Sequence, residues 1–130
     1  MYAPPPSLNL VVLRSRDLTH AERFYRAFGF FFVRHRHGTG PEHLAGGPME
    51  GSTVLEIYPL RDGQPDTTAV RIGFRVDTVD VYIEKLIAAG GTLLTAPHDS
   101  EWGRRAVLRD PDGHIVELVC PEERGPVAQV

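Results

Sequence analysis

The sequence has one cysteine, no long apolar run and no cationic leader, and each of these scarcities excludes a class of protein. Because a single cysteine, Cys120, cannot form a disulfide within the chain, we expect a reducing compartment and therefore a cytoplasmic protein. The start of the chain lacks the cationic and then apolar stretches of a signal peptide, and no apolar run is long enough to cross a bilayer. We therefore expect no association with a membrane.

The chain also has no excess of positive charge. The formal net charge of −3 at pH 7 argues against a surface that binds nucleic acid in general. No G-x-S-x-G nucleophile motif is present, and the short glycine groups are typical of turns, not of a phosphate-binding loop. The remaining composition, 42% hydrophobic and 24% charged over 130 residues, indicates a single domain over residues 1–130.

The chain repeats one order of predicted elements, with an offset of about 60 residues between its halves. In each half an apolar strand precedes an amphipathic helix that ends at a glycine, and three further strands follow. The first-half strands are expected at 8–13, at 30–37, near His43 and at 52–59. The second-half strands are expected at 70–76, near Leu93, at 105–109 and at 114–119. We therefore predict one β-α-β-β-β module over residues 8–60 and a second over residues 68–120.

Alternation along these strands predicts which side chains point away from the helices. The core side is expected to carry apolar residues: Leu55, Ile57, Ile72, Phe74, Val116 and Leu118. Glu56, Arg71 and Glu117 alternate with them, so we expect these three on the inner, concave surface of a curved sheet. Charged residues in such positions are most often part of a solvated face, and a pocket lining is the functional alternative.

Three segments, RDLTHAERFYRAFGF, TVLEIYPL and DPDGHIVEL, occur in this order on the doubled plan. Together they resemble the vicinal oxygen chelate superfamily, which contains glyoxalase I, extradiol dioxygenases, fosfomycin-resistance enzymes and bleomycin-resistance proteins. The resemblance covers nearly the whole chain. It implies an α+β fold in which two β-α-β-β-β modules curve around a shared cleft, and it implies a homodimer. It does not fix a reaction, because one fold hosts many sites.

In metal-binding members of this superfamily the ligands come from the first and last strands of each module. The matching positions here are Leu10, Glu56, Arg71 and Glu117. Leucine cannot coordinate a metal, and the guanidinium of Arg71 has a fixed positive charge and no lone pair to donate. Two carboxylates also leave zinc short of its usual three or four protein ligands. We therefore expect no metal cofactor at this position, and any metal that did bind there would use Glu56 and Glu117.

The same argument gives Glu117 a partner. A lone carboxylate among apolar residues loses its hydration, and a nearby guanidinium offsets that loss, so we predict that Arg71 pairs with Glu117. Leu10 and Tyr58 would then supply apolar walls of a pocket beside them.

Further candidates lie on two turns. His35 and His37 share a face of a predicted strand and His43 follows a tight turn, so three imidazoles on one hairpin could hold zinc. A polar hairpin exposed to solvent is the alternative, and we prefer it. His43 alone is a candidate hydrogen-bond donor at a pocket rim. Trp102, just before a strand, could cover a ligand, and a packing role is as compatible with its position.

These residues support three hypotheses. In the first, the protein resembles the glyoxalase and bleomycin-resistance proteins and binds a small molecule without the usual divalent metal. Arg71 would contact an anionic or carbonyl group of that molecule, and Glu56 or Glu117 would accept a hydrogen bond or act as a base. In the second, it is a metal-dependent lyase or isomerase of glyoxalase I type with ligands outside the usual set. In the third, it sequesters a molecule without turnover.

Overall fold

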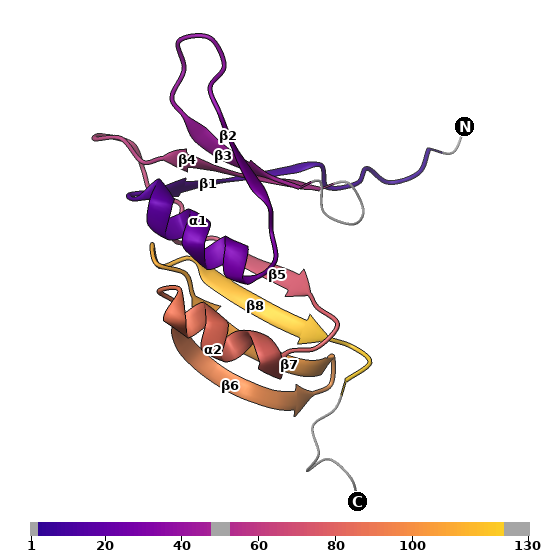
Figure 1. Ribbon diagram of the computed structural model, residues 1–130. Helices are drawn as coiled ribbons and strands as arrows, with labels where there is room; N and C mark the ends of the chain where they lie inside the picture. Colours follow the sequence, from indigo (N-terminus) through magenta and orange to yellow (C-terminus); the bar gives the residue numbers. More distant parts are fainter. Residues whose placement is uncertain (1–2, 48–52, 124–130) are drawn as a thin grey trace, which may run out of the picture.

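The structure, a computed structural model, describes residues 3–47 and 53–123 and contains two four-stranded sheets with one helix each (Figure 1). The first half of the chain runs β1, α1, β2, β3, β4, and the second half repeats this order as β5, α2, β6, β7, β8. The α+β class and the doubled β-α-β-β-β order predicted from the sequence are therefore confirmed.

The first sheet has the strand order β1-β4-β3-β2. Its strands are β1 (Leu10–Ser15), β2 (Phe32–His35), β3 (His43–Gly46) and β4 (Val54–Pro59), with β1 and β4 parallel and the other pairs antiparallel. β2 stops at His35, short of the predicted end at residue 37. Its partner begins only after Pro41, which has no N–H to donate to a ladder. Ser52, predicted to begin the last strand, lies outside the described residues.

The second sheet has the equivalent order β5-β8-β7-β6. Its strands are β5 (Arg71–Arg75), β6 (Thr92–Ser100), β7 (Gly103–Arg109) and β8 (Ile115–Cys120), with β5 and β8 parallel. β6 is longer than the sequence suggested, although it contains Pro97. An edge strand tolerates proline, and the pairing with β7 shifts register between Thr95 and His98, on either side of that residue.

The two helices begin with different caps. α1 (Leu18–Ala27) starts after Asp17, whose carboxylate accepts a hydrogen bond from the His20 backbone N–H at 3.1 Å. α2 (Asp80–Ala88) has no such local cap. The carboxylate of Glu123, from the far end of the described chain, accepts from the Val79 N–H at 2.9 Å and so places negative charge at the helix N-terminus. Neither helix of the described chain is long and apolar enough to span a membrane.

Aromatic side chains join the two halves into one core. Phe28, the residue that caps the end of α1, packs against Phe74 of β5, with ring centroids 5.1 Å apart, and against Tyr82 of α2 at 5.7 Å. Figure 1 accordingly shows α1 between the first sheet and β5. The predicted core-side residues Leu55, Ile57, Phe74, Val116 and Leu118 are buried, whereas Ile72 is only partly so. The opposite side of each sheet is therefore free to carry a site.

Candidate functional site

Each sheet has one side that does not pack into the core. We call the side of the first sheet that carries Leu10, Val12, Glu56 and Tyr58 the Glu56 face. We call the side of the second sheet that carries Arg71, Gly73, Arg105, Glu117 and Val119 the Glu117 face. Strand register defines both sets, because paired residues on neighbouring strands share a side of the sheet.

On the Glu117 face the carboxylate of Glu117 lies between two guanidinium groups. Arg71 donates from Nε to Oε2 and from Nη2 to Oε1, both at 3.4 Å. Arg105 approaches Oε1 more closely, through both Nε and Nη2. Partial burial alone would raise the pKa of Glu117, but hydrogen bonds and charge from Arg105 and Arg71 outweigh it and hold the pKa below its usual value.

The predicted contact between Arg71 and Glu117 is thus present, but it is not a buried pair. The Arg71 side chain is 50% exposed, and its two contacts are long for charged hydrogen bonds. Sequence reasoning did not identify Arg105 as a partner of Glu117. Alternation from the buried Ala106 places Arg105 on the Glu117 face, while Arg104 turns to Asp80 of α2.

A pocket of about 440 Å³ opens on this face. Its lining residues are Arg71, Gly73, Trp102, Arg105, Glu117 and Val119. Trp102, in the turn between β6 and β7, is 62% exposed, so its indole stands at the mouth of the pocket, where a ligand would meet it. Two guanidinium groups and one carboxylate leave the lining with an excess of one positive charge.

The Glu56 face has different chemistry. Oε2 of Glu56 lies 3.7 Å from Nε2 of His43, which is too far for a hydrogen bond. The His43 ring stacks on Tyr58 with centroids 4.1 Å apart and an interplanar angle of 7°. His43 is only 1% exposed, so the expectation of a donor at a pocket rim was wrong. The ring is buried because β3 runs inside the sheet, where Tyr58 covers one of its faces, whereas His35 and His37 are exposed.

The candidate residues therefore form two groups. Leu10, Glu56, Tyr58 and His43 belong to the first sheet, whereas Arg71, Trp102 and Glu117 belong to the second. The alternation rule placed Glu56, Arg71 and Glu117 on the surface of one curved sheet, and this was wrong, because the two modules form separate sheets. Leu10 is 46% exposed and does not line the 440 Å³ pocket.

A larger pocket, of about 870 Å³, lies between the halves. Its wall is mainly apolar and aromatic, including Phe28, Phe30, Phe31 and Phe74. Its cation, Arg75, is already paired with Glu122 at the surface. Because charged groups converge in the smaller pocket and not in this one, we place the candidate site on the Glu117 face.

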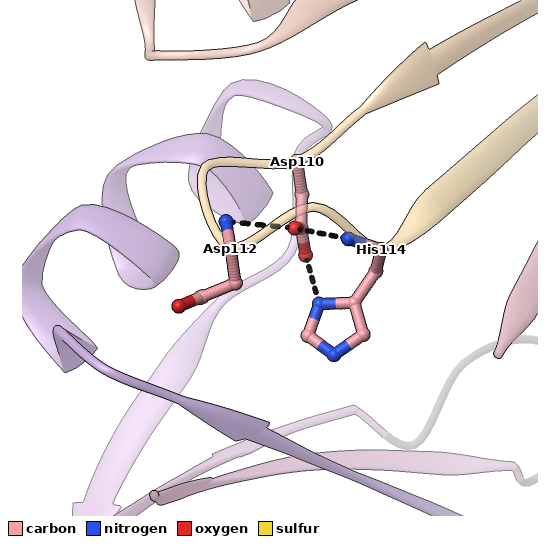
Figure 2. Close-up of side chains that lie close together, drawn as sticks. All are labelled: Asp110, Asp112 and His114. Carbon is pink, nitrogen blue, oxygen red and sulfur yellow. Dashed lines mark hydrogen bonds and ion pairs between the residues drawn. The ribbon is translucent and has the colours of Figure 1, made fainter. Parts of the chain in front are cut away.

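A third cluster, Asp110, Asp112 and His114, has the composition of a metal site, but the carboxylate of Asp110 and the ring nitrogens of His114 already have partners within the protein (Figure 2). Oδ1 of Asp110 accepts from three backbone N–H groups of its own turn, each at 3.0 Å. Oδ2 accepts from the Tyr25 hydroxyl at 2.7 Å and pairs with Nδ1 of His114 at 2.8 Å. The second ring nitrogen of His114 contacts Oγ1 of Thr67 at 2.6 Å.

This cluster ties the halves together. It links α1, the linker between β4 and β5 and the turn between β7 and β8, and its side chains from Tyr25, Asp110 and His114 are buried. Burial, together with the charge of Asp110 and the hydrogen bond to it, raises the pKa of Tyr25 well above its usual value. Sequence reasoning treated Asp110 as part of a turn and missed its partners, because Tyr25 is 85 residues away along the chain.

Comparison with known proteins places these features in context. Residues 7–118 match the family model of the Glyoxalase/Bleomycin resistance protein/Dioxygenase superfamily. An uncharacterized protein of Mycolicibacterium smegmatis is 27% identical over 117 residues, which is 90% of this chain and 96% of that protein. A putative glyoxylase of Mycobacterium bovis, CFP32, is 27% identical over 114 residues, and the match covers 85% of this chain but only 44% of CFP32.

Among solved structures, TnmS3, an antibiotic binding protein from Streptomyces, superposes with a TM-score of 0.74 at 25% identity. The superposition covers 93% of this chain and all of TnmS3.

Proposed function

The chain belongs to the Glyoxalase/Bleomycin resistance protein/Dioxygenase superfamily, and we propose that it binds a small organic anion in the pocket of the Glu117 face. The observation that carries this proposal is the unequal pairing of Glu117. Arg105 makes the close contacts and so neutralises the carboxylate, while Arg71 makes only long ones. Arg71 therefore keeps donors for a ligand, and a guanidinium prefers a planar anion such as a carboxylate.

The apolar part of the ligand would contact Trp102 and Val119, which line the same pocket. An exposed indole beside a guanidinium suits a flat, partly aromatic molecule, because the ring supplies a large apolar surface with few torsions to immobilise. The likeness to TnmS3, which binds an antibiotic, supports a bulky organic ligand in preference to a small inorganic ion.

The metal usual in this superfamily does not fit the residues at the corresponding positions. Leu10 has no ligand atom, and Arg71 places a fixed positive charge where a cation would sit. The lone pairs of Glu117 are already directed at two guanidinium groups. We therefore propose that ligand binding on this face needs no metal.

Glu117 is also a weak base. A carboxylate whose pKa is held below its usual value takes up a proton less readily, which lowers its use in general base catalysis at neutral pH. This favours binding or sequestration over turnover. It also argues against a lyase or isomerase of glyoxalase I type, in which a metal polarises the substrate and a carboxylate moves the proton. Purified protein, with or without added nickel or zinc, should form no thioester from the hemithioacetal of methylglyoxal and glutathione.

Trp102 provides the test of the proposed function, because it is the only tryptophan of the chain and lines the pocket. Titration with 3-phenylpropionate should change its fluorescence, and the neutral amide of the same acid should bind at least about 10-fold more weakly, since one charged hydrogen bond contributes about 1.5–3 kcal/mol. Arg71→Gln should abolish this preference for the acid. Arg61→Gln, in the exposed linker, is the matched control and should keep it. Equal affinity for acid and amide in the wild-type protein would contradict the proposal.

A homodimer in the cytoplasm remains part of the proposal. Several large apolar side chains are exposed on or beside the first sheet: Leu8, Leu10, Val12, Phe31 and Val33. Apolar side chains gathered in this way are typical of surfaces that a second protein covers. Sedimentation equilibrium should therefore give twice the mass of 14.4 kDa.

A further inference from the structure

His43 has a buried nitrogen without a partner. Its side chain is 1% exposed, yet Nε2 makes no hydrogen bond within the described part of the chain. A buried polar atom is normally satisfied, because leaving one unpaired costs about 1–3 kcal/mol. Oε2 of Glu56 lies 3.7 Å from this nitrogen.

The other ring nitrogen fixes the tautomer. Nδ1 lies 3.2 Å from the carbonyl oxygen of Pro41, which can only accept, so Nδ1 carries the hydrogen in the neutral ring. Nε2 then carries a lone pair that faces the carboxylate of Glu56. These two acceptors repel each other unless a cation or a proton lies between them. A ring whose Nδ1–H donates to a backbone carbonyl is also the usual arrangement of a metal-binding histidine.

The spacing suits a metal ion. Two ligand atoms on one tetrahedral zinc ion, with bonds of about 2.0–2.2 Å, lie about 3.4 Å apart, which is close to the 3.7 Å between Nε2 and Oε2. Tyr58 holds the imidazole in place by stacking on it. Two exposed imidazoles are within reach: the ring centroids of His35 and His37 lie 6.0 Å and 5.2 Å from that of His43.

We propose that His43, Glu56 and one of His35 and His37 bind a borderline transition-metal ion such as Zn²⁺. An exposed histidine can turn toward the buried pair at small cost, and two histidines with one glutamate are the three protein ligands of an open zinc site. This site lies within one sheet and uses β3 and the hairpin before it. It therefore differs from a site that bridges Glu56 and Glu117, and it needs no ligand from the Glu117 face.

Charges around the site permit a cation. No described guanidinium is paired with Glu56, in contrast to Glu117. Arg14, on the neighbouring strand β1, lies over the Tyr58 ring at 5.6 Å from its centroid. Because β4 runs between β1 and β3, Tyr58 separates Arg14 from His43.

The test is calorimetric titration of the full chain with Zn²⁺ alone. We expect one ion per chain. Glu56→Gln, which keeps the shape of the side chain, should weaken binding by more than about 100-fold, beyond the 10–100-fold that changes around a metal site cost. The double variant His35→Gln/His37→Gln should do the same. The matched control is His20→Gln/His98→Gln, which also removes two exposed imidazoles and should leave the affinity unchanged.

His43→Gln should abolish binding, but a buried substitution can also unfold the chain, so its thermal melt is measured alongside. Glu56→Gln and the double variant change only partly or fully exposed side chains and keep the test decisive. Two results would overturn the proposal. One is the absence of Zn²⁺ binding to the wild-type chain. The other is binding that needs His35 and His37 but survives in Glu56→Gln, which is chelation by two surface imidazoles.

Discussion

Glu56 and Glu117 occupy equivalent positions in the two halves of the molecule, yet their diagonal neighbours on the adjacent strands differ in charge. Ala45 pairs with Glu56 in the first sheet and Val107 pairs with Glu117 in the second. Two residues before these partners lie His43 and Arg105, respectively. The parallel neighbours differ in the same way. Val12 pairs with Glu56 and Gly73 pairs with Glu117, and the residues two positions before these partners are Leu10 and Arg71, respectively.

If both proposals hold, one module serves two kinds of ligand. The backbone places a carboxylate and two diagonal neighbours at the same point on each sheet. Leu10 and His43 leave the carboxylate of Glu56 without a paired guanidinium among the described residues, whereas Arg71 and Arg105 neutralise Glu117 and leave one positive charge in excess. On these proposals, two side chains per module set whether the face attracts cations or anions, without any change of fold.

The largest effect on stability should come from removing the Asp110 cluster that joins the two halves. Asp110→Ala removes the acceptor of the Tyr25 hydroxyl, of three backbone N–H groups and of His114. Removing one partner of a buried pair costs about 3–5 kcal/mol, so the free energy of unfolding in denaturant should fall by that order. Asp62→Ala, in the exposed linker, should cost less than about 0.5 kcal/mol. Equal unfolding midpoints would show that the cluster does not hold the halves together.

A smaller effect is expected for Arg105→Gln, which makes the Glu117 face resemble the Glu56 face. Glu117 would lose its closer partner and recruit Arg71, so the affinity for 3-phenylpropionate should fall by about 10-fold or more. Fluorescence of Trp102 measures this, with Arg109→Gln, on the same strand but outside the pocket lining, as the control. Unchanged affinity would mean that Arg105 plays no part in freeing Arg71.

The pH dependence of stability tests whether Glu117 is held in an ion pair in the folded protein. Because the folded-state pKa of Glu117 lies below its unfolded value, its pairing stabilises the fold above the ordinary carboxyl pKa of about 4.3 and is lost as pH falls through the folded value. Wild type should therefore be more stable than Glu117→Gln at neutral pH, and the difference should shrink below about pH 4. Thermal melts at several pH values measure it. If the stability difference between wild type and Glu117→Gln grew on acidification, the pKa of Glu117 would be raised in the folded protein and not lowered.

The smallest effect should be that of Arg71→Gln on stability. A half-exposed ion pair contributes about 0–1 kcal/mol, so this variant should unfold within about 1 kcal/mol of wild type although it loses the preference for an anionic probe. The fully buried pair inferred from sequence would have cost several times more. A loss of more than about 3 kcal/mol would restore that interpretation.

Sequence reasoning succeeded where the signal is local. Strand alternation alone placed Leu55 and Ile57 in the core and Glu56 opposite them, because neighbouring side chains on a strand point to opposite sides. Apolar periodicity and glycine stops likewise located both helices.

The errors concern contacts between one strand and the next. The burial of His43 depends on Tyr58, which stacks on it from another strand. The pairing of Arg105 with Glu117 depends on the register of β7 against β8. Neither the stacking nor the register can be derived from one strand alone, so the two faces could not be separated before the fold was known.

One measurement tests the contrast between the two faces most directly. In ¹H–¹⁵N spectra, 3-phenylpropionate and Zn²⁺ are added in separate titrations to the same protein. The acid should shift the indole N–H of Trp102 and the Nε–H groups of Arg71 and Arg105, while Zn²⁺ should shift the imidazole of His43 and leave Trp102 unchanged. If both additions shift the same set of side chains, or if the acid acts on His43 and not on Trp102, the two glutamates do not serve two kinds of ligand and the account is wrong.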